Sequence, residues 1–100
     1  MSSKSLVRVE IITTQALDED FTEAFKKYKV AAHFTKINPV MGAGFSNPHL
    51  GDAIWPQLNI MFIIYCSESD AETIKKIVTD MRRLYPTEGV GCFISSAEVY

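Results

Sequence analysis

The residues with the clearest chemical potential are the glycines, because all five fall in two short parts of the chain. Gly42, Gly44 and Gly51 lie within residues 41–57, and Gly89 and Gly91 lie within residues 87–91. Glycine adopts positive φ readily and lets the backbone approach a ligand closely. A series of backbone N–H groups in such a segment can hold a phosphate. An ordinary loop also fits the first pair, since no helix or Lys-Ser/Thr completes a P-loop pattern.

Two arginines precede the second glycine segment. Arg82 and Arg83 fall in the last turn of an expected helix, a few residues before Gly89. Guanidinium groups beside a glycine loop can form an anion site, because each presents a fork of N–H donors. Cations at the end of a helix also complement the helix dipole without binding any ligand. The sequence leaves both interpretations open.

The first glycine segment is long for a connection in a small domain. Connections above ~12–15 residues are uncommon and are usually functional or disordered. Residues 41–57 contain Phe45 and Trp55 but only one formal charge, Asp52, which is not the composition of a disordered segment. Tryptophan is enriched at binding hot spots, but it also anchors loops and subunit contacts. We therefore expect a functional loop in which Phe45 and Trp55 are candidate partner-binding residues.

Other reactive residues form no recognisable catalytic or metal-binding set. His33 and His49 are far apart, and no nucleophile, histidine and acid recur at a meaningful spacing. Cys66 and Cys92 each lie in an apolar run, which favours two buried small hydrophobic residues over a disulfide or a metal pair. The sequence therefore predicts neither an enzyme nor a metal site.

The composition limits the class of protein. A chain of 100 residues is expected to form a single domain, 1–100. The net charge of −2 gives no electrostatic support for nucleic-acid binding. No apolar run approaches the ~20 residues that cross a bilayer, and the N-terminus does not resemble a signal peptide. We expect a cytoplasmic protein that does not insert into a membrane.

The hydrophobic pattern predicts six elements in the order βαββαβ. Alternation marks strands and helical spacing marks helices. The second helix is expected to start with a capping box formed by Ser69 and Glu72, and to end before Pro86. This order indicates an α+β, ferredoxin-like two-layer sandwich with a four-stranded antiparallel sheet. The expected strands are residues 6–13, 31–37, 58–66 and 90–99, and the expected helices are 17–28 and 69–85.

One face of this sheet is too apolar to stay exposed. If Ile60, Phe62 and Ile64 face the helices, the residues between them, Met61, Ile63 and Tyr65, face the other way. A solvated face of an antiparallel sheet normally carries polar side chains. We therefore expect a homo-oligomer packed through this face, with polar pairs from Arg8, Glu10 and Asn59 fixing the register. A monomer with a local cover is the alternative.

The element order and the start of the long loop resemble the PII family of signal-transduction proteins. The stretch Ile37–Ser46 resembles the PII segment in which a hydrophobic strand is followed by Val-Lys-Gly-Phe-Gly-Arg-Gln. Val40, Gly42 and Gly44 match this pattern, whereas Met41, Phe45 and Ser46 replace its lysine, arginine and glutamine. The second loop, Thr87–Ile94, is shorter than in PII proteins and lacks their lysine. The arginine-rich C-terminal segment of PII is also absent.

The resemblance implies a homotrimer that binds an adenine nucleotide in the cleft between subunits. Residues 41–57 would be the T-loop, which docks on a transporter, an enzyme or a regulator. The shortened second loop leaves open whether the effector is a nucleotide or another small molecule, and no cofactor is certain. The implied ligand-binding residues are Gly42, Gly44 and Ser46 at the T-loop base and Thr87, Gly89 and Gly91 in the second loop, with Arg82 and Arg83 replacing the missing cations.

Two other functions remain compatible with the residues. The CutA divalent-cation tolerance proteins share the trimeric fold, and Ile37-Asn38-Pro39 with Trp55 loosely resembles a CutA pattern. The chain could equally be a protein-interaction module that binds no small ligand and uses Phe45 and Trp55.

Overall fold

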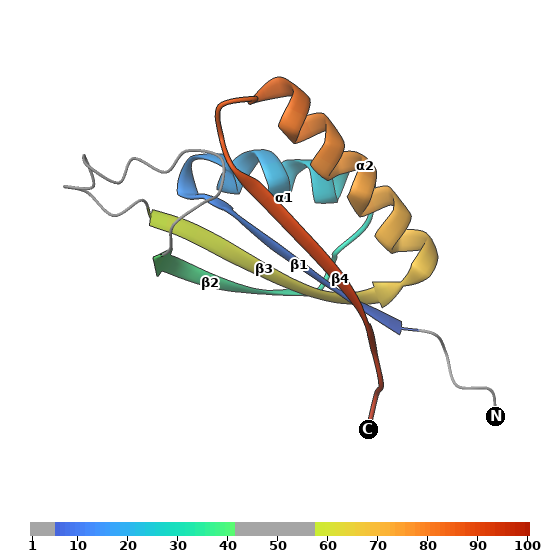
Figure 1. Ribbon diagram of the computed structural model, residues 1–100. Coiled ribbons are helices and arrows are strands. Elements are labelled where there is room, and N and C mark those ends of the chain that lie inside the picture. Colours follow the sequence, from blue (N-terminus) through green and yellow to red (C-terminus); the bar gives the residue numbers. More distant parts are fainter. Residues whose placement is uncertain (1–5, 42–57) are drawn as a thin grey trace.

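The computed structural model describes residues 6–41 and 58–100, which form a single four-stranded antiparallel sheet covered by two helices. The strand order is β2-β3-β1-β4, and Figure 1 shows both helices on one face. The α+β class and the ferredoxin-like order are confirmed. The elements are β1 (Leu6–Thr14), η1 (Gln15–Leu17), α1 (Asp18–Lys27), β2 (Phe34–Met41), β3 (Leu58–Ser67), α2 (Glu68–Leu84) and β4 (Val90–Ala97).

The core lies between the helices and one face of the sheet. Alternate residues of the central strands are fully buried there, including Val9 and Ile11 in β1 and Ile60 and Phe62 in β3. Each helix contributes one apolar stripe, as expected for an amphipathic helix that covers a sheet. The helical residues of this core are Phe21, Phe25, Ala71, Ile74, Ile77, Val78 and Met81.

Four phenylalanine rings join α1 to the strands beneath it. Phe62 of β3 lies 5.4 Å from the ring of Phe25 and 5.3 Å from that of Phe34, both in edge-on geometry. Phe21 lies 6.0 Å from Phe62 and 5.9 Å from Phe25. Aromatic pairs at these separations contribute ~0.5–1.5 kcal/mol beyond their buried area. The cluster fixes β2, an edge strand, to the rest of the core.

The predicted boundaries of the second strand are wrong at both ends. β2 begins at Phe34 rather than at Ala31, because Lys29 and Ala31 have φ values of 56° and 53°, which no strand residue adopts. It then continues to Met41, past a register shift between Ile37 and Val40. The last strand also ends earlier than expected, at Ala97 rather than Val99.

The N-cap of α2 differs from the predicted capping box. Ser67, not Ser69, caps this helix, since its hydroxyl oxygen accepts a hydrogen bond of 3.1 Å from the backbone N–H of Asp70. The helix therefore starts at Glu68, directly after β3, and Ser69 lies within its first turn. Both Ser67 and Ser69 are followed three residues later by an acidic residue. Because β3 passes directly into α2, the earlier serine is the one that caps the helix.

Replacing each serine in turn distinguishes the two caps. Loss of an N-cap hydroxyl typically costs ~0.5–2 kcal/mol, so we expect Ser67→Ala to lower the free energy of unfolding by about 1 kcal/mol. Ser69→Ala is the matched control and should change stability by less than about 0.5 kcal/mol, because it only alters a helix interior position. Urea unfolding followed by circular dichroism measures both. A larger loss for Ser69→Ala would contradict the observed cap.

Candidate ligand-binding site

The predicted site residues divide into two groups. Gly42, Gly44, Phe45, Ser46 and Trp55 lie outside the described residues. Those that the structure describes gather at the end of α2 and the start of β4. They are Arg82 and Arg83 on the last turn of the helix, Thr87 and Gly89 in the turn that follows, and Gly91 in the strand.

Arg82 is held by the backbone of β4. Its Nε and Nη2 atoms donate to the carbonyl oxygen of Val90 at 3.1 and 2.8 Å. This geometry orients the guanidinium group, which retains further N–H donors on Nη1 for another acceptor. Arg82 therefore joins the end of the helix to the first residue of the strand. Its role extends beyond the dipole complementation that the sequence suggested.

Arg83 makes no comparable bond to the backbone of any residue that the structure describes. Its Nη2 donates to Asp80 at 3.0 Å, in an ion pair between residues one helical turn apart, and its side chain is 72% exposed. Exposed pairs of this kind contribute ~0.2–1 kcal/mol or less, so an incoming anion can compete for the guanidinium group. Of the two arginines, Arg83 is the one more available to a ligand.

The turn between α2 and β4 is tied to the body of the protein. The N–H of Tyr85 donates to Met81, and the N–H of Glu88 donates to the carbonyl of Tyr85 at 3.0 Å. The hydroxyl of Tyr85 donates a short hydrogen bond to Asp20, which raises the pKa of Tyr85. This contact links the end of α2 to α1. The turn is consequently anchored on both sides.

The two glycines of this segment have different roles. The carbonyl of Gly89 accepts a 3.0 Å hydrogen bond from Thr13, a fully buried polar residue of β1. A Cβ atom on Gly91 would lie 3.2 Å from the ring of Phe93, which occupies that space on the sheet face away from the helices. Neither glycine has positive φ. Gly91 thus leaves room for the ring of Phe93, which would have to shift slightly if a side chain were added, and it does not serve an unusual backbone conformation.

The start of the long segment lies at the same end of the sheet. Three cross-strand pairs show this. Val90 of β4 pairs with Thr13 of β1, and the next residue of β1, Thr14, pairs with Asn59 of β3. Asn59 in turn pairs with Val40 near the end of β2. The turn 85–89 and the end of β2 are therefore at one end, but on opposite edges, with β1 and β3 between them. Three strand spacings separate the two edges, about 14 Å. A ligand touching both would cross the ends of the central strands.

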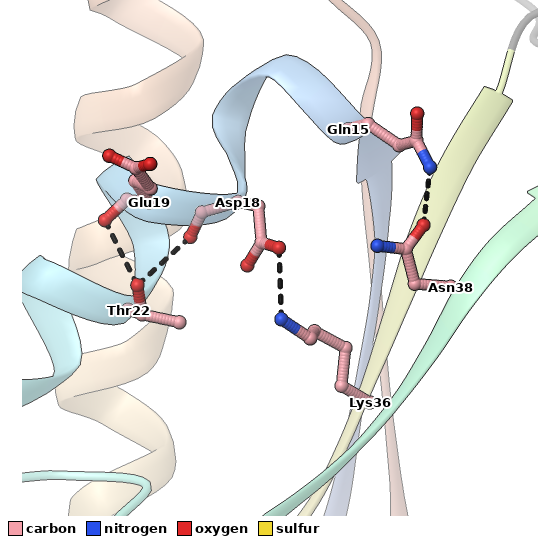
Figure 2. Close-up of polar contacts among 6 residues, drawn as sticks. All are labelled: Gln15, Asp18, Glu19, Thr22, Lys36 and Asn38. Carbon is pink, nitrogen blue, oxygen red and sulfur yellow. Dashed lines mark hydrogen bonds and ion pairs between the residues drawn. The ribbon is translucent and has the colours of Figure 1, made fainter.

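Polar contacts fix the end of β2 next to the start of α1. Lys36 donates to Asp18 at 2.9 Å, and the side-chain amide of Gln15 donates to the side-chain oxygen of Asn38 (Figure 2). The hydroxyl of Thr22 bonds the carbonyls of Asp18 and Glu19 on the same turn. These contacts position β2 where it leads into residue 42. The orientation of this strand end is therefore set by the corner between β1 and α1.

The sheet face away from the helices is partly apolar, as the alternation predicted. Tyr65 and Phe93 are 55% and 57% exposed there, and Met61 and Ile63 are half-buried. Arg8 donates to the hydroxyl of Tyr65 at 3.0 Å and to Glu10 at 2.8 Å. The pKa of Arg8 is raised mainly by the hydrogen bond to Glu10, and to a smaller extent by the hydrogen bond to Tyr65. The two charges on this face neutralise each other within one chain.

The two cysteines are free thiols on the helix-facing side of the sheet. Cys66 of β3 pairs with Val7, and Cys92 of β4 pairs with Ile11, so β1 separates them. Burial raises the pKa of both thiols, and at Cys92 this outweighs the opposing influence of Arg82 and Lys75. Both thiols are thereby kept protonated, as expected for small hydrophobic residues and not for nucleophiles.

The described residues form neither a metal site nor a membrane span. In residues 6–41 and 58–100, no three histidine, cysteine or acidic side chains come together where they could hold a metal ion. Neither of the helices in this part of the chain has the length and apolar character of a membrane span.

Sequence reasoning missed the residues that support the site. Thr13 occupies a position where the alternation of β1 points into the core, and a hydroxyl there needs a partner. That signal was visible in the run Val7, Val9, Ile11, Thr13. The contacts of Lys36 with Asp18 and of Gln15 with Asn38 join segments far apart in the chain, so no local pattern marked them.

The contrast between the two arginines is testable through stability. Arg82→Ala removes two hydrogen bonds from a charged donor to the Val90 carbonyl, so we expect a loss of about 1–2 kcal/mol in the free energy of unfolding. Arg83→Ala removes one exposed ion pair and should cost less than about 0.5 kcal/mol. Chemical denaturation of both variants without ligand gives the comparison. Equal losses would show that the Arg82 contacts do not support β4.

No protein-family model matches the chain, and no curated protein sequence does. Several solved structures resemble its fold, among them the following three. CPII, a nitrogen regulatory PII-like protein from Thiomonas intermedia K12 bound to ADP, AMP and bicarbonate, has a TM-score of 0.71 at 16% identity, with 99% of this chain and 97% of that chain covered. A protein of Thermus thermophilus, assigned to PII-like signalling, has a TM-score of 0.69 at 22% identity, covering 99% and 93%.

The third structure is a protein of unknown function from Pediococcus pentosaceus ATCC 25745, with a TM-score of 0.59 at 16% identity, covering 97% of this chain and 94% of that one. All three likenesses extend over nearly the whole length of both chains. They confirm at the level of the fold the resemblance that the sequence suggested. This chain has the fold of the PII-like signalling proteins.

Proposed function

We propose that this chain is a divergent PII-like regulatory protein, a cytoplasmic homotrimer that binds a small effector between subunits. An adenine nucleotide is the first candidate, and residues 41–57 would carry the signal to a target protein. The observation that carries the proposal is the agreement in fold, over the whole chain, with a nitrogen regulatory PII-like protein crystallised with ADP and AMP. We propose a regulatory role because that neighbour is described as a nitrogen regulatory protein.

The described half of the site supports an anionic ligand. Arg82 and Arg83 bring two guanidinium groups to the last turn of α2, which leads into the turn 85–89, and that turn is anchored through Tyr85 and Thr13. Within residues 6–41 and 58–100, Arg83 is engaged only by the half-buried Asp80, so a phosphate can displace that carboxylate. The site lies at the end of the sheet where β2 leads into residue 42. To reach the start of the proposed signalling segment, a ligand held there would extend about 14 Å across the ends of β1 and β3.

The open sheet face supports oligomerisation. Burial of apolar surface stabilises a contact by ~25 cal/mol per Å², and Tyr65 and Phe93 each leave more than half of their surface free. The only charges contributed to this face by the paired positions of β1 and β3 are Arg8 and Glu10, which are bonded to each other. No uncompensated charge would therefore be buried there when copies associate. Trimeric association through this face is the arrangement we propose.

Nucleotide binding should appear as thermal stabilisation. A ligand at about 100 times its dissociation constant adds ~2.7 kcal/mol, so we expect ADP or AMP to raise Tm by several degrees. Arg83→Ala should reduce the shift strongly. Lys76→Ala, which removes an exposed cation two turns earlier on the same helix, is the matched control and should leave the shift unchanged. No shift with ADP, AMP or ATP would exclude the nucleotide and favour an interaction module.

The oligomer should depend on the open face. Ile63→Glu places a carboxylate at the centre of that face and should convert the trimer largely to monomer, because burying an unpaired charge is costly. Thr79→Glu adds the same charge on the exposed side of α2 and should leave the mass unchanged. Light scattering coupled to gel filtration measures both. A wild-type monomer, or a trimer that tolerates Ile63→Glu, would contradict the proposed interface.

A further inference from the structure

The two edges of the sheet are protected to different degrees. The β2 edge carries Lys36, Pro39 and a register shift, all of which hinder the addition of another strand. The β4 edge, Val90–Ala97, has eight residues and contains no charge, no proline and no register shift against β1. Among the described residues β4 pairs with β1 alone. Figure 1 shows it (red) along one edge of the sheet.

The outward-facing backbone groups of β4 can be identified from Arg82. The Val90 carbonyl accepts twice from that side chain, so it faces the free edge and not β1. In an antiparallel pair, residues two apart point their N–H and C=O groups to the same side. Cys92, Ile94 and Ser96 therefore present theirs to the free edge as well. Arg82 covers only the first of these positions.

A pocket adjoins this edge on the helix side. It has a volume of about 460 Å³ and lies between the first half of α2 and the sheet. Its apolar lining comes from Val7, Ala71 and Ile94, and its charged residues are Glu68, Glu72 and Lys75. Ile94 is thus both a residue of the strand edge and part of the pocket wall. Along the strand it lies four residues from Val90, about 13 Å from the candidate ligand site.

The charge of the pocket selects one class of side chain. The ammonium group of Lys75 is paired with the carboxylate of Glu72 at 2.7 Å. The second carboxylate of the pocket, that of Glu68, therefore gives the lining an excess negative charge. A lysine or arginine side chain can lay its apolar stem along such a wall and keep its charged end at the carboxylates. An acidic side chain would meet Glu68 and be repelled.

We propose that the β4 edge binds an extended peptide segment that carries a basic residue, with that side chain in the pocket beside Glu68. In this mode the backbone hydrogen bonds of an added strand supply affinity, and a pocket for alternate side chains supplies specificity. The neighbouring side chains of the peptide, on its other face, lie next to Phe93. The backbone groups of this edge lie in the plane of the sheet, whereas trimerisation is proposed through the open face, and Phe93 lies where the two surfaces meet.

The test uses a labelled peptide of fixed design, acetyl-Thr-Val-Lys-Val-Thr-amide, and its counterpart with glutamate in place of lysine. Fluorescence anisotropy at low ionic strength should show the lysine peptide binding about two- to fivefold more tightly, the range expected for an exposed ion pair. Glu68→Lys should abolish or invert that preference. Equal affinity of the two peptides, or no binding of either, would overturn the proposal.

Ser96→Pro tests the strand edge. It removes an N–H that faces outward, which a proline on an edge strand tolerates, and it should weaken the lysine peptide about tenfold. Ser95→Ala, on the open face, is the matched control and should bind as the wild type does. Circular dichroism verifies that both variants remain folded. Unchanged binding by a folded Ser96→Pro variant would overturn the proposal.

The same variant separates a peptide from a second copy of this chain. If Ser96→Pro lowers the oligomeric mass without any peptide, another copy occupies the edge and the proposal is wrong. If the mass stays the same and peptide affinity falls, the edge binds a foreign segment as proposed. The nucleotide test and the Ile63→Glu test give their results independently of this outcome.

Discussion

The packing of Phe62 against the rings of Phe21, Phe25 and Phe34 is the interaction on which the rest of the structure depends. It joins α1, the central strand β3 and the edge strand β2 in one cluster. In the part of the chain that the structure describes, β2 pairs with β3 alone and carries a register shift, so side-chain packing must supply stability that strand pairing does not. With β2 fixed, the polar contacts of Lys36 and Asn38 can orient its end toward residue 42. The position at which the chain enters residues 42–57 therefore depends on a core contact near the other end of β2.

A sheet with helices on one side has consequences for its other face. The helices bury alternate residues of each strand, and every remaining side chain must find another environment. In this chain that face combines exposed aromatic residues with a single pair of opposite charges, Arg8 and Glu10, already bonded to each other. Gly91 belongs to the same arrangement, since its missing side chain makes room for Phe93. The glycine that suggested phosphate binding also has a steric explanation.

The periodic parts of the sequence predicted the fold well, because their pattern reflects burial directly. Ile60, Phe62 and Ile64 identified the buried face of β3, and the stripe from Ala71 to Met81 identified α2. Local conformation was harder to predict: Ala31 has positive φ despite its apolar neighbours, and either Ser67 or Ser69 could have capped α2. For the candidate site, the sequence indicated only which segment of the chain is involved, and not the contacts within it. The bonds of Arg82 to Val90 and of Thr13 to Gly89 depend on tertiary proximity, which one sequence does not encode locally.

The pairing of Met41 with Leu58 means that the chain leaves the sheet and returns to it at adjacent positions. A segment whose two ends are fixed side by side can change in length without altering the register of either strand. Each doubling in length of such a connection costs only ~0.6 kcal/mol in closure entropy. A change in the length of residues 42–57 is therefore expected to leave the pairing of β2 with β3 in place.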